Sequence, residues 1–165
     1  MSDPTPRSVA DEIGQRIPFA SRGQEAMVAL LRSADVVRWS LGRQMAPEDL
    51  TLQQYNVLRI LRGAGPGGLP TLEIGERMVE RQPGVTRLVD RLVKKGLVER
   101  TRGARDRRVV RCSITERGLE VLSCLDGAVE QTDARVVEAV GEERLAALID
   151  TLDLLRATLR DDPAD

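Results

Sequence analysis

Residues 69–114 read LPTLEIGERMVERQPGVTRLVDRLVKKGLVERTRGARDRRVVRCSI, and this stretch decides the fold. Its first part predicts a short helix over residues 71–79. The apolar side of that helix consists of Leu72, Ile74 and Met78. After a turn at residues 80–82, a second helix begins at Pro83, a residue type that suits the first helical turn. Two helices joined by a tight turn are typical of a helix-turn-helix.

The second helix, which Gly96 ends, has an apolar and a polar side. Its apolar residues, at helical spacing, are Val85, Leu88, Val89, Leu92 and Val93. The polar side is left with Gln82, Thr86, Arg87, Arg91 and Lys94. An α-helix fits the major groove of duplex DNA, where arginine reads guanine and threonine meets a base edge or a thymine methyl group. We therefore expect this side to contact DNA, although a structural ion pair is an equally good interpretation of Arg91.

Two β-strands follow, over residues 97–102 and 108–114, and form a hairpin. The loop between them carries Arg105, Asp106, Arg107 and Arg108. A thin hairpin with arginines at its tip suits the narrow, electronegative minor groove. Amphipathic helices and basic hairpins are each common, but the three elements in this order predict a winged helix-turn-helix.

Charge is distributed unevenly along the chain. The protein has 165 residues and a net charge of −1, yet residues 77–111 hold twelve Arg and Lys against four Asp and Glu. That segment has a net charge of +8, and the remainder carries −9. A basic middle between acidic ends is the pattern of a compact phosphate-binding module. Chance clustering on a solvated helix face is the alternative interpretation.

Helices are predicted on both sides of this module. A short helix is expected over residues 8–15, and a long one over residues 22–45. Thr51 and Gln54 fit a capping box for a helix that runs to about Arg62, before a glycine-rich turn. Thr115 caps a further long helix that runs to about Val140. In the last helix, leucines spaced 3, 4, 3, 4 predict packing against another helix in a dimer: Leu145, Leu148, Leu152, Leu155 and Leu159.

The predicted fold class is mainly α, a winged helix-turn-helix with a two-stranded β-hairpin wing and N- and C-terminal dimerisation helices. Residues 1–7 form a disordered N-terminus, and residues 8–48 form the N-terminal dimerisation helices. Residues 49–114 form the DNA-binding domain, and residues 115–165 form the C-terminal dimerisation helices.

Five segments of the chain resemble the MarR family of transcriptional regulators. They are LPTLEIGERM (69–78), PGVTRLVDRL (83–92), GLVER (96–100), DRRVV (106–110) and IT (114–115). The upstream stretch LTLQQYNVL (50–58) is similar to the helix that leads into the motif in that family. The resemblance covers residues 30–159 and implies a homodimer with interlocked terminal helices, one winged lobe per subunit, and repression through a pseudo-palindromic operator.

The resemblance also implies roles for individual residues. Gln82, Thr86, Arg87 and Arg91 contact the major groove and adjacent phosphates, and Arg108 enters the minor groove. Asp106 orients Arg108, or it is an ordinary turn former. The set of expected DNA-binding residues is Thr71, Gln82, Thr86, Arg87, Arg91, Lys94, Arg105, Asp106, Arg107 and Arg108.

Members of this family commonly bind a small aromatic or phenolic effector in a crevice between the dimer helices and the lobe. Trp39 and Tyr55 line such a crevice, or they are plain core residues. A redox switch is an interpretation of Cys112 and Cys124, but both lie on otherwise buried patterns, which favours inert packing.

Other functions find little support in the sequence. The chain has no histidine, which excludes nucleophilic triads that depend on one, and its two cysteines lack zinc-ligand spacing. We expect no enzyme activity, no metal, no cofactor and no membrane partner, and a cytoplasmic location, since no signal peptide or apolar span is evident. A winged-helix protein-interaction or scaffold module remains the alternative to DNA binding.

Overall fold

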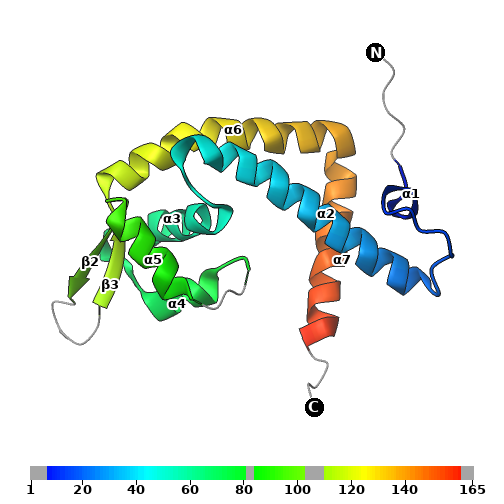
Figure 1. Ribbon diagram of the computed structural model, residues 1–165, viewed down its shortest axis with the longest axis horizontal. Coiled ribbons are helices and arrows are strands. Elements are labelled where there is room, and N and C mark those ends of the chain that lie inside the picture. The colour runs from blue at the N-terminus through cyan, green and yellow to red at the C-terminus, as the bar shows by residue number, and fades with distance from the viewer. Residues whose placement is uncertain (1–6, 81–83, 103–109, 161–165) are drawn as a thin grey trace.

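The computed structural model describes residues 7–80, 84–102 and 110–160. A winged lobe lies at one end, and long helices extend away from it (Figure 1). The lobe contains α3 (Leu52–Ala64), α4 (Thr71–Arg77), α5 (Val85–Lys94) and a small sheet. The remaining helices are α1 (Val9–Glu12), α2 (Arg22–Met45), α6 (Glu116–Val140) and α7 (Glu142–Arg160). Two 3-10 turns, η1 (Ala46–Glu48) and η2 (Gly65–Gly67), precede and follow α3.

Local sequence explains where the long helices begin. The hydroxyl of Ser21 accepts a hydrogen bond from the backbone N–H of Gln24, and the hydroxyl of Thr115 does the same for Gly118. Thr51 and Gln54 form both halves of a capping box at the start of α3. The predicted bounds of α2 and the predicted caps of α3 and α6 are therefore confirmed.

The sheet has three antiparallel strands, one more than the sequence predicted. β1 (Leu69–Pro70), β2 (Val98–Arg102) and β3 (Val110–Ile114) lie in the order β1-β3-β2, so the predicted hairpin gains a partner at β3. Cys112 of β3 is paired with Leu69 on one side and with Arg100 on the other. The sequence did not predict β1, because a two-residue strand is too short to show apolar–polar alternation and its pairing partner lies about forty residues away.

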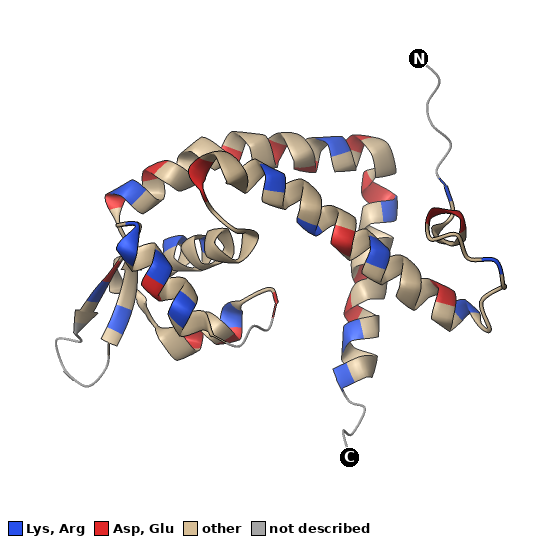
Figure 2. Ribbon diagram, in the orientation of Figure 1, with Lys and Arg blue, Asp and Glu red and all other residues tan. Residues whose placement is uncertain are grey.

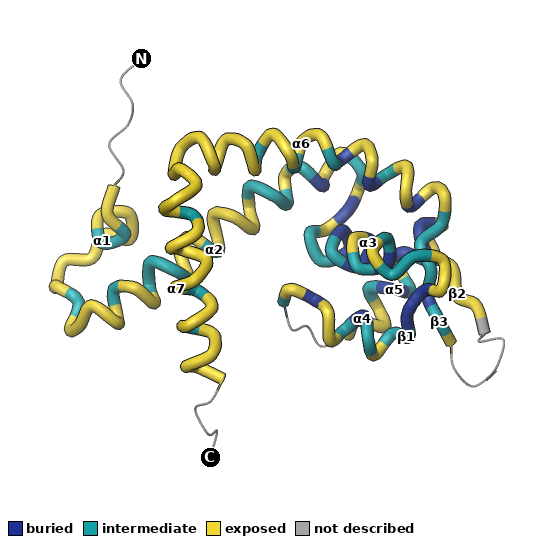
Figure 3. The backbone as a smooth tube through the Cα atoms, turned by 180° about the vertical axis from the view of Figure 1, so that it is seen from behind, coloured by how far each residue is buried: buried dark blue, intermediate teal, exposed yellow. Residues whose placement is uncertain are grey.

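The hydrophobic core lies in the lobe and under the first half of α6. Its completely buried residues include Met45, Val57, Leu58, Leu61, Ile74, Val89, Leu92, Cys112 and Leu122. Figure 3 shows that α7, the far half of α6 and the N-terminal half of α2 are mostly exposed. A bidentate ion pair joins the lobe to α6. The Arg62 guanidinium donates to both Asp126 carboxylate oxygens, at 2.7 and 3.2 Å. The hydrogen bonds from Arg62 hold the pKa of Asp126 below its usual value.

Two predicted core residues are exposed. Leu72 of α4 has 77% of its surface exposed, because it lies two positions before the buried Ile74 and hence on the opposite side of the helix. Cys124 of α6 is exposed for the same reason, two positions after the buried Leu122. The prediction of burial was therefore wrong for Cys124 and correct for Cys112.

Several helix bounds also differ from prediction. The first helix is a single turn, α1, with Ser8 as its N-cap and Gly14 at a φ of 65° just after it. The helix α4 ends at Arg77, two residues earlier than predicted. The helix α5 begins at Val85, whereas the prediction placed its start at Pro83, which lies outside the described residues.

Candidate nucleic-acid interface

The helix α5 presents one polar face to solvent. Val89 and Leu92 are completely buried against the lobe, whereas Thr86, Arg87, Arg91 and Lys94 are all exposed. Gly84, at a φ of 97°, is the N-cap, and its carbonyl accepts hydrogen bonds from the backbone N–H groups of Arg87 and Leu88. The predicted division of α5 into an apolar and a polar side is confirmed. Figure 2 shows the basic bands along α5 and its neighbours.

Several Arg and Lys side chains of the basic segment, residues 77–111, form ion pairs or hydrogen bonds within the lobe. Arg77 pairs with Glu73, Lys95 with Asp49, and Arg100 with Asp90. The Arg111 guanidinium donates to the carbonyls of Gly67 and Gly68, both at 2.7 Å, and so binds η2 to the sheet. In contrast, none of the ion pairs between described residues involves Arg87, Arg91 or Lys94. The positive charge on the polar face of α5 is therefore not neutralised by the described parts of the lobe.

The contact between Asp90 and Arg100 joins α5 to the sheet. Arg100 Nη1 lies 2.6 Å from Asp90 Oδ1. Burial opposes the charge of Arg100, but hydrogen bonds to Asp90 and Cys112 outweigh it and raise the pKa of the guanidinium. The contact fixes α5 relative to the strand that leads into the wing. Sequence reasoning missed it, because the two residues are ten positions apart on different elements.

Comparison with known proteins identifies this arrangement. The model of the MarR family matches residues 50–110. A MarR transcription factor from Planctomyces limnophilus is 38% identical, with 83% of this chain and 99% of that chain covered and a TM-score of 0.62. The chain belongs to the MarR family. It is thus a member of a family of transcriptional regulators, as the sequence motifs indicated.

Two further structures resemble this MarR protein in fold. The MepR–DNA complex from S. aureus is 18% identical, covers 84% of this chain and 99% of that one, and has a TM-score of 0.74. CouR from Rhodococcus jostii RHA1, bound to p-coumaroyl-CoA, is 23% identical, covers 83% of this chain and 95% of that one, and has a TM-score of 0.70. At these identities the likeness concerns the winged-helix fold alone.

The predicted DNA-binding residues of this MarR protein fall into three groups. Thr86, Arg87, Arg91 and Lys94 lie together on α5. Thr71 begins α4, is half-buried, and turns its hydroxyl toward β3, where Oγ1 lies 3.7 Å from Cys112 Sγ. The other predicted contacts lie outside the described residues: Gln82, Arg105, Asp106, Arg107 and Arg108. The strands β2 and β3 run up to the segment that holds the last four, whose roles stay predictions.

The two aromatic residues assigned to an effector crevice have different surroundings. Tyr55 is buried in the lobe core, and its hydroxyl accepts a hydrogen bond of 2.8 Å from Arg59 Nη1. Trp39 of α2 is 64% exposed, with the guanidinium of Arg43 4.8 Å from its ring centroid. Tyr55 thus fits the interpretation as a core residue, and Trp39 does not.

Trp39 lines a hollow of about 350 Å³ between α2 and α6. Its other walls are Ser40, Arg43, Gln44, Thr132 and Arg135. Gln44 Nε2 donates to Thr132 Oγ1 at 2.7 Å, but the buried Gln44 Oε1 has no hydrogen-bond partner among the described residues. The lining of the hollow is therefore largely polar and includes the guanidinium groups of Arg43 and Arg135 beside the Trp39 ring.

The leucine seam of α7 is only partly covered in the single chain. Leu145, Leu152 and Leu155 are half-buried, whereas Leu148 and Leu159 are exposed. Ile149 and Leu154, which the heptad spacing left out, are also exposed. Within the described ranges, no helix has the length and apolar content needed to cross a bilayer, and no group of three or more acidic or cysteine side chains is placed to hold a metal ion.

Proposed function

We propose that this MarR protein binds duplex DNA as a homodimer and represses transcription from a pseudo-palindromic operator. The observation that carries the proposal is the polar face of α5, where Thr86, Arg87, Arg91 and Lys94 are exposed and make no ion pairs with the described residues. An α-helix with this face fits the major groove, where arginine forms two hydrogen bonds with guanine O6 and N7. The wing strands β2 and β3 extend beside it toward the minor groove.

The helices outside the lobe support the homodimer. Large apolar side chains are exposed along α2, α6 and α7, among them Leu31, Val37, Val136, Leu148, Ile149 and Leu154. Exposure of so many large apolar side chains is unfavourable in water and supports an interface on these helices. A two-fold symmetric pairing of these helices gives the dimer two α5 helices, one for each half-site of a pseudo-palindrome.

Salt dependence of binding tests the proposal. Affinity for a duplex from the region upstream of its own gene, measured by fluorescence anisotropy, should fall steeply as salt rises. The expected slope of log affinity against log salt is about −0.9 for each phosphate contacted. A protein-interaction module, the alternative function, gives a flat slope, and a flat slope would therefore contradict DNA recognition.

Replacing Arg87 with alanine should relax base preference. Arg87 is exposed on the polar face of α5, in the first turn of the helix, so its loss removes a major-groove contact without disturbing the core. The expected cost at the best operator is about 1 to 3 kcal/mol, with less discrimination at one or two base pairs. Binding to a panel of singly substituted operators measures this. If Arg87→Ala loses the same binding affinity for every operator in the panel, Arg87 contacts only phosphate and does not read bases.

A small aromatic or phenolic effector is proposed for the hollow beside Trp39. The indole ring offers a stacking surface, and Arg43 and Arg135 offer charge to a carboxylate. Family membership and the ligand-bound CouR structure, which shares the fold, support an effector of some kind.

Fluorescence tests the effector hollow directly, because Trp39 is the single tryptophan of the chain. Benzoate, added while the indole is excited at the red edge of its absorption, should quench or shift the emission in a saturable way. Arg135→Met should weaken this response roughly tenfold, as expected for one charge-assisted hydrogen bond. Phenol serves as the control for the carboxylate contact: it lacks that group, so any response to phenol should be the same in the wild type and in Arg135→Met. Equal affinity of benzoate for the wild type and Arg135→Met would refute this site.

A further inference from the structure

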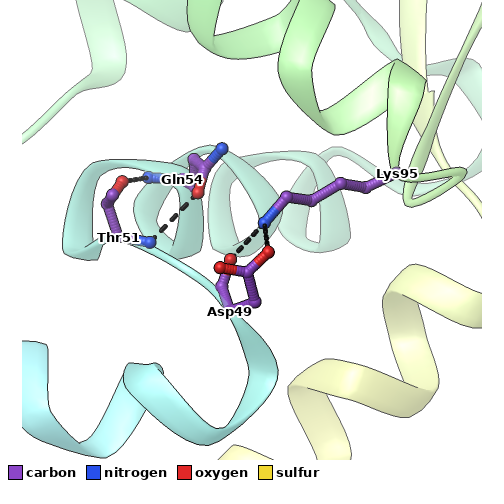
Figure 4. Close-up of polar contacts among 4 residues, drawn as sticks. All are labelled: Asp49, Thr51, Gln54 and Lys95. Carbon is purple, nitrogen blue, oxygen red and sulfur yellow. Dashed lines mark hydrogen bonds and ion pairs between the residues drawn. The ribbon is translucent and has the colours of Figure 1, made fainter.

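The C-terminal end of α5 is tied to the corner between α2 and α3. Lys95, the C-cap of α5, reaches across to Asp49, and its Nζ lies 2.8 Å from Asp49 Oδ2. The same Nζ also donates to the backbone carbonyl of Asp49 (Figure 4). The Lys95 side chain is 29% exposed and that of Asp49 is 96% exposed, so the ion pair lies at the surface of the lobe and Asp49 binds the Lys95 charge there. The basic segment therefore contains one lysine with a different task from its neighbour Lys94.

The anchor residue Asp49 has a constrained backbone. Its φ of 52° and ψ of 39° are left-handed, and it is the one residue other than glycine with a positive φ in the described ranges. Aspartate and asparagine tolerate this conformation better than most residues. Asp49 N–H donates to the Ala46 carbonyl at 3.0 Å, and the capping box of Thr51 and Gln54 begins two residues later. The corner that receives Lys95 is thus held from both sides.

The segment before α5 is tied to the same pair of helices. Glu80 accepts a hydrogen bond from Gln53 Nε2 of α3 at 3.2 Å and lies 3.5 Å from Arg38 Nη1 of α2. The backbone N–H of Val79 donates to Asn56 Oδ1 of α3 at 3.0 Å. Polar contacts to the unit formed by α2 and α3 are therefore made both by the segment that precedes α5 and by the C-terminal end of α5. Of these, the contact between Lys95 and Asp49 is the one made by α5's own end.

We infer that Lys95 is a positioning residue for DNA recognition: by binding Asp49 it sets the direction of α5 relative to α2, and so selects the spacing between the two half-sites. The inference rests on the proposed function, because α2 belongs to the helices that pair the subunits and α5 is the helix that enters the groove. A change in the angle of α5 alters the distance between the two α5 helices of a dimer. Half-site spacing is a geometric property that such a distance determines.

Operators of different spacing test the inference. The reference duplex is the genomic fragment that the wild type binds most tightly. It is compared with two variants, in which one base pair is inserted or removed at the centre. Lys95→Met keeps the apolar stem and loses the charge, so it should reduce the preference for the native spacing roughly three- to tenfold, with the salt slope unchanged. Lys95→Arg should restore the preference.

Lys94→Met is the matched control, since it removes the same charge from the neighbouring exposed position. It should lower affinity by a similar factor at every spacing and make the salt slope of the dimer less steep by about 1.8, because each of the two subunits loses one phosphate contact. Asp49→Asn retains the left-handed backbone without the charge and should relax spacing as Lys95→Met does. If circular dichroism shows that Lys95→Met does not fold, Asp49→Asn alone tests the inference.

Three results overturn the inference in different ways. If the wild type binds no duplex at low salt, the proposed function fails and the inference fails with it. If the wild type binds and both Lys95→Met and Asp49→Asn keep the native spacing preference, DNA binding stands and Lys95 has no positioning role. Equal relaxation of spacing by Lys94→Met would also overturn it, since the effect would then be one of charge alone.

Discussion

Gly68→Ala should lower the free energy of unfolding by about 3 kcal/mol, from backbone strain and overpacking together. Gly68 has a φ of 55° and a ψ of −173°, a region that only glycine adopts readily. A Cβ atom there would lie 2.4 Å from both the carbonyl oxygen of Cys112 and the hydroxyl of Ser113. The carbonyl belongs to the central strand β3 and cannot move without breaking the pairing with β1 or β2.

Urea unfolding followed by circular dichroism measures this loss. The matched control is Gly67→Ala, one residue earlier, where a Cβ atom would meet no other heavy atom within 4 Å. That variant should stay within about 0.5 kcal/mol of the wild type, as is usual for exposed positions. Similar unfolding free energies for the two alanine variants would show that the close approach of η2 to β3 is not needed for stability.

Gly118→Ala should lower the free energy of unfolding by about 2 kcal/mol, even though alanine is the better helix former. A Cβ atom at this position in the first turn of α6 would lie 2.4 Å from the Leu97 carbonyl oxygen and 2.7 Å from Ile114 Cγ1. The same carbonyl accepts a hydrogen bond of 3.1 Å from the backbone N–H of Thr115. The helix start must therefore shift away from the sheet to make room.

Gly127→Ala, on the same helix, provides the comparison. A Cβ atom there would contact nothing within 4 Å, so the variant should gain about 0.5 to 1 kcal/mol from helix propensity alone. The two substitutions are chemically identical and should change the midpoint of thermal unfolding in opposite directions. Stabilisation by both would mean that α6 does not pack against the Leu97 carbonyl as described.

Features that depend on neighbouring residues could be predicted from the sequence. The caps Ser21, Thr51 and Thr115 mark helix starts because each hydroxyl bonds a backbone N–H three residues later. The apolar spacing in α5 separated the buried Val89 and Leu92 from the exposed Arg87 and Arg91 for the same local reason. The family motifs then placed these elements in a winged helix-turn-helix, and the comparisons confirmed it.

Features that join distant parts of the chain appeared only in the tertiary structure. The strand β1 exists because Leu69 meets Cys112, forty-three positions away. Leu72 and Cys124 have apolar neighbours in the sequence, but the direction of each side chain on its helix leaves it exposed. Lys94 and Lys95 are identical in type and adjacent, yet one faces solvent and the other binds Asp49.

The sequence of this MarR protein by itself determined where the long helices lie and which face of α5 is polar, since hydrogen bonds and side-chain spacing within a few residues decide both. The tertiary structure alone decided which cations of the basic segment remain available on that face. An ion pair such as that of Lys95 and Asp49 depends on a distance in space between residues 46 positions apart, which no local pattern encodes.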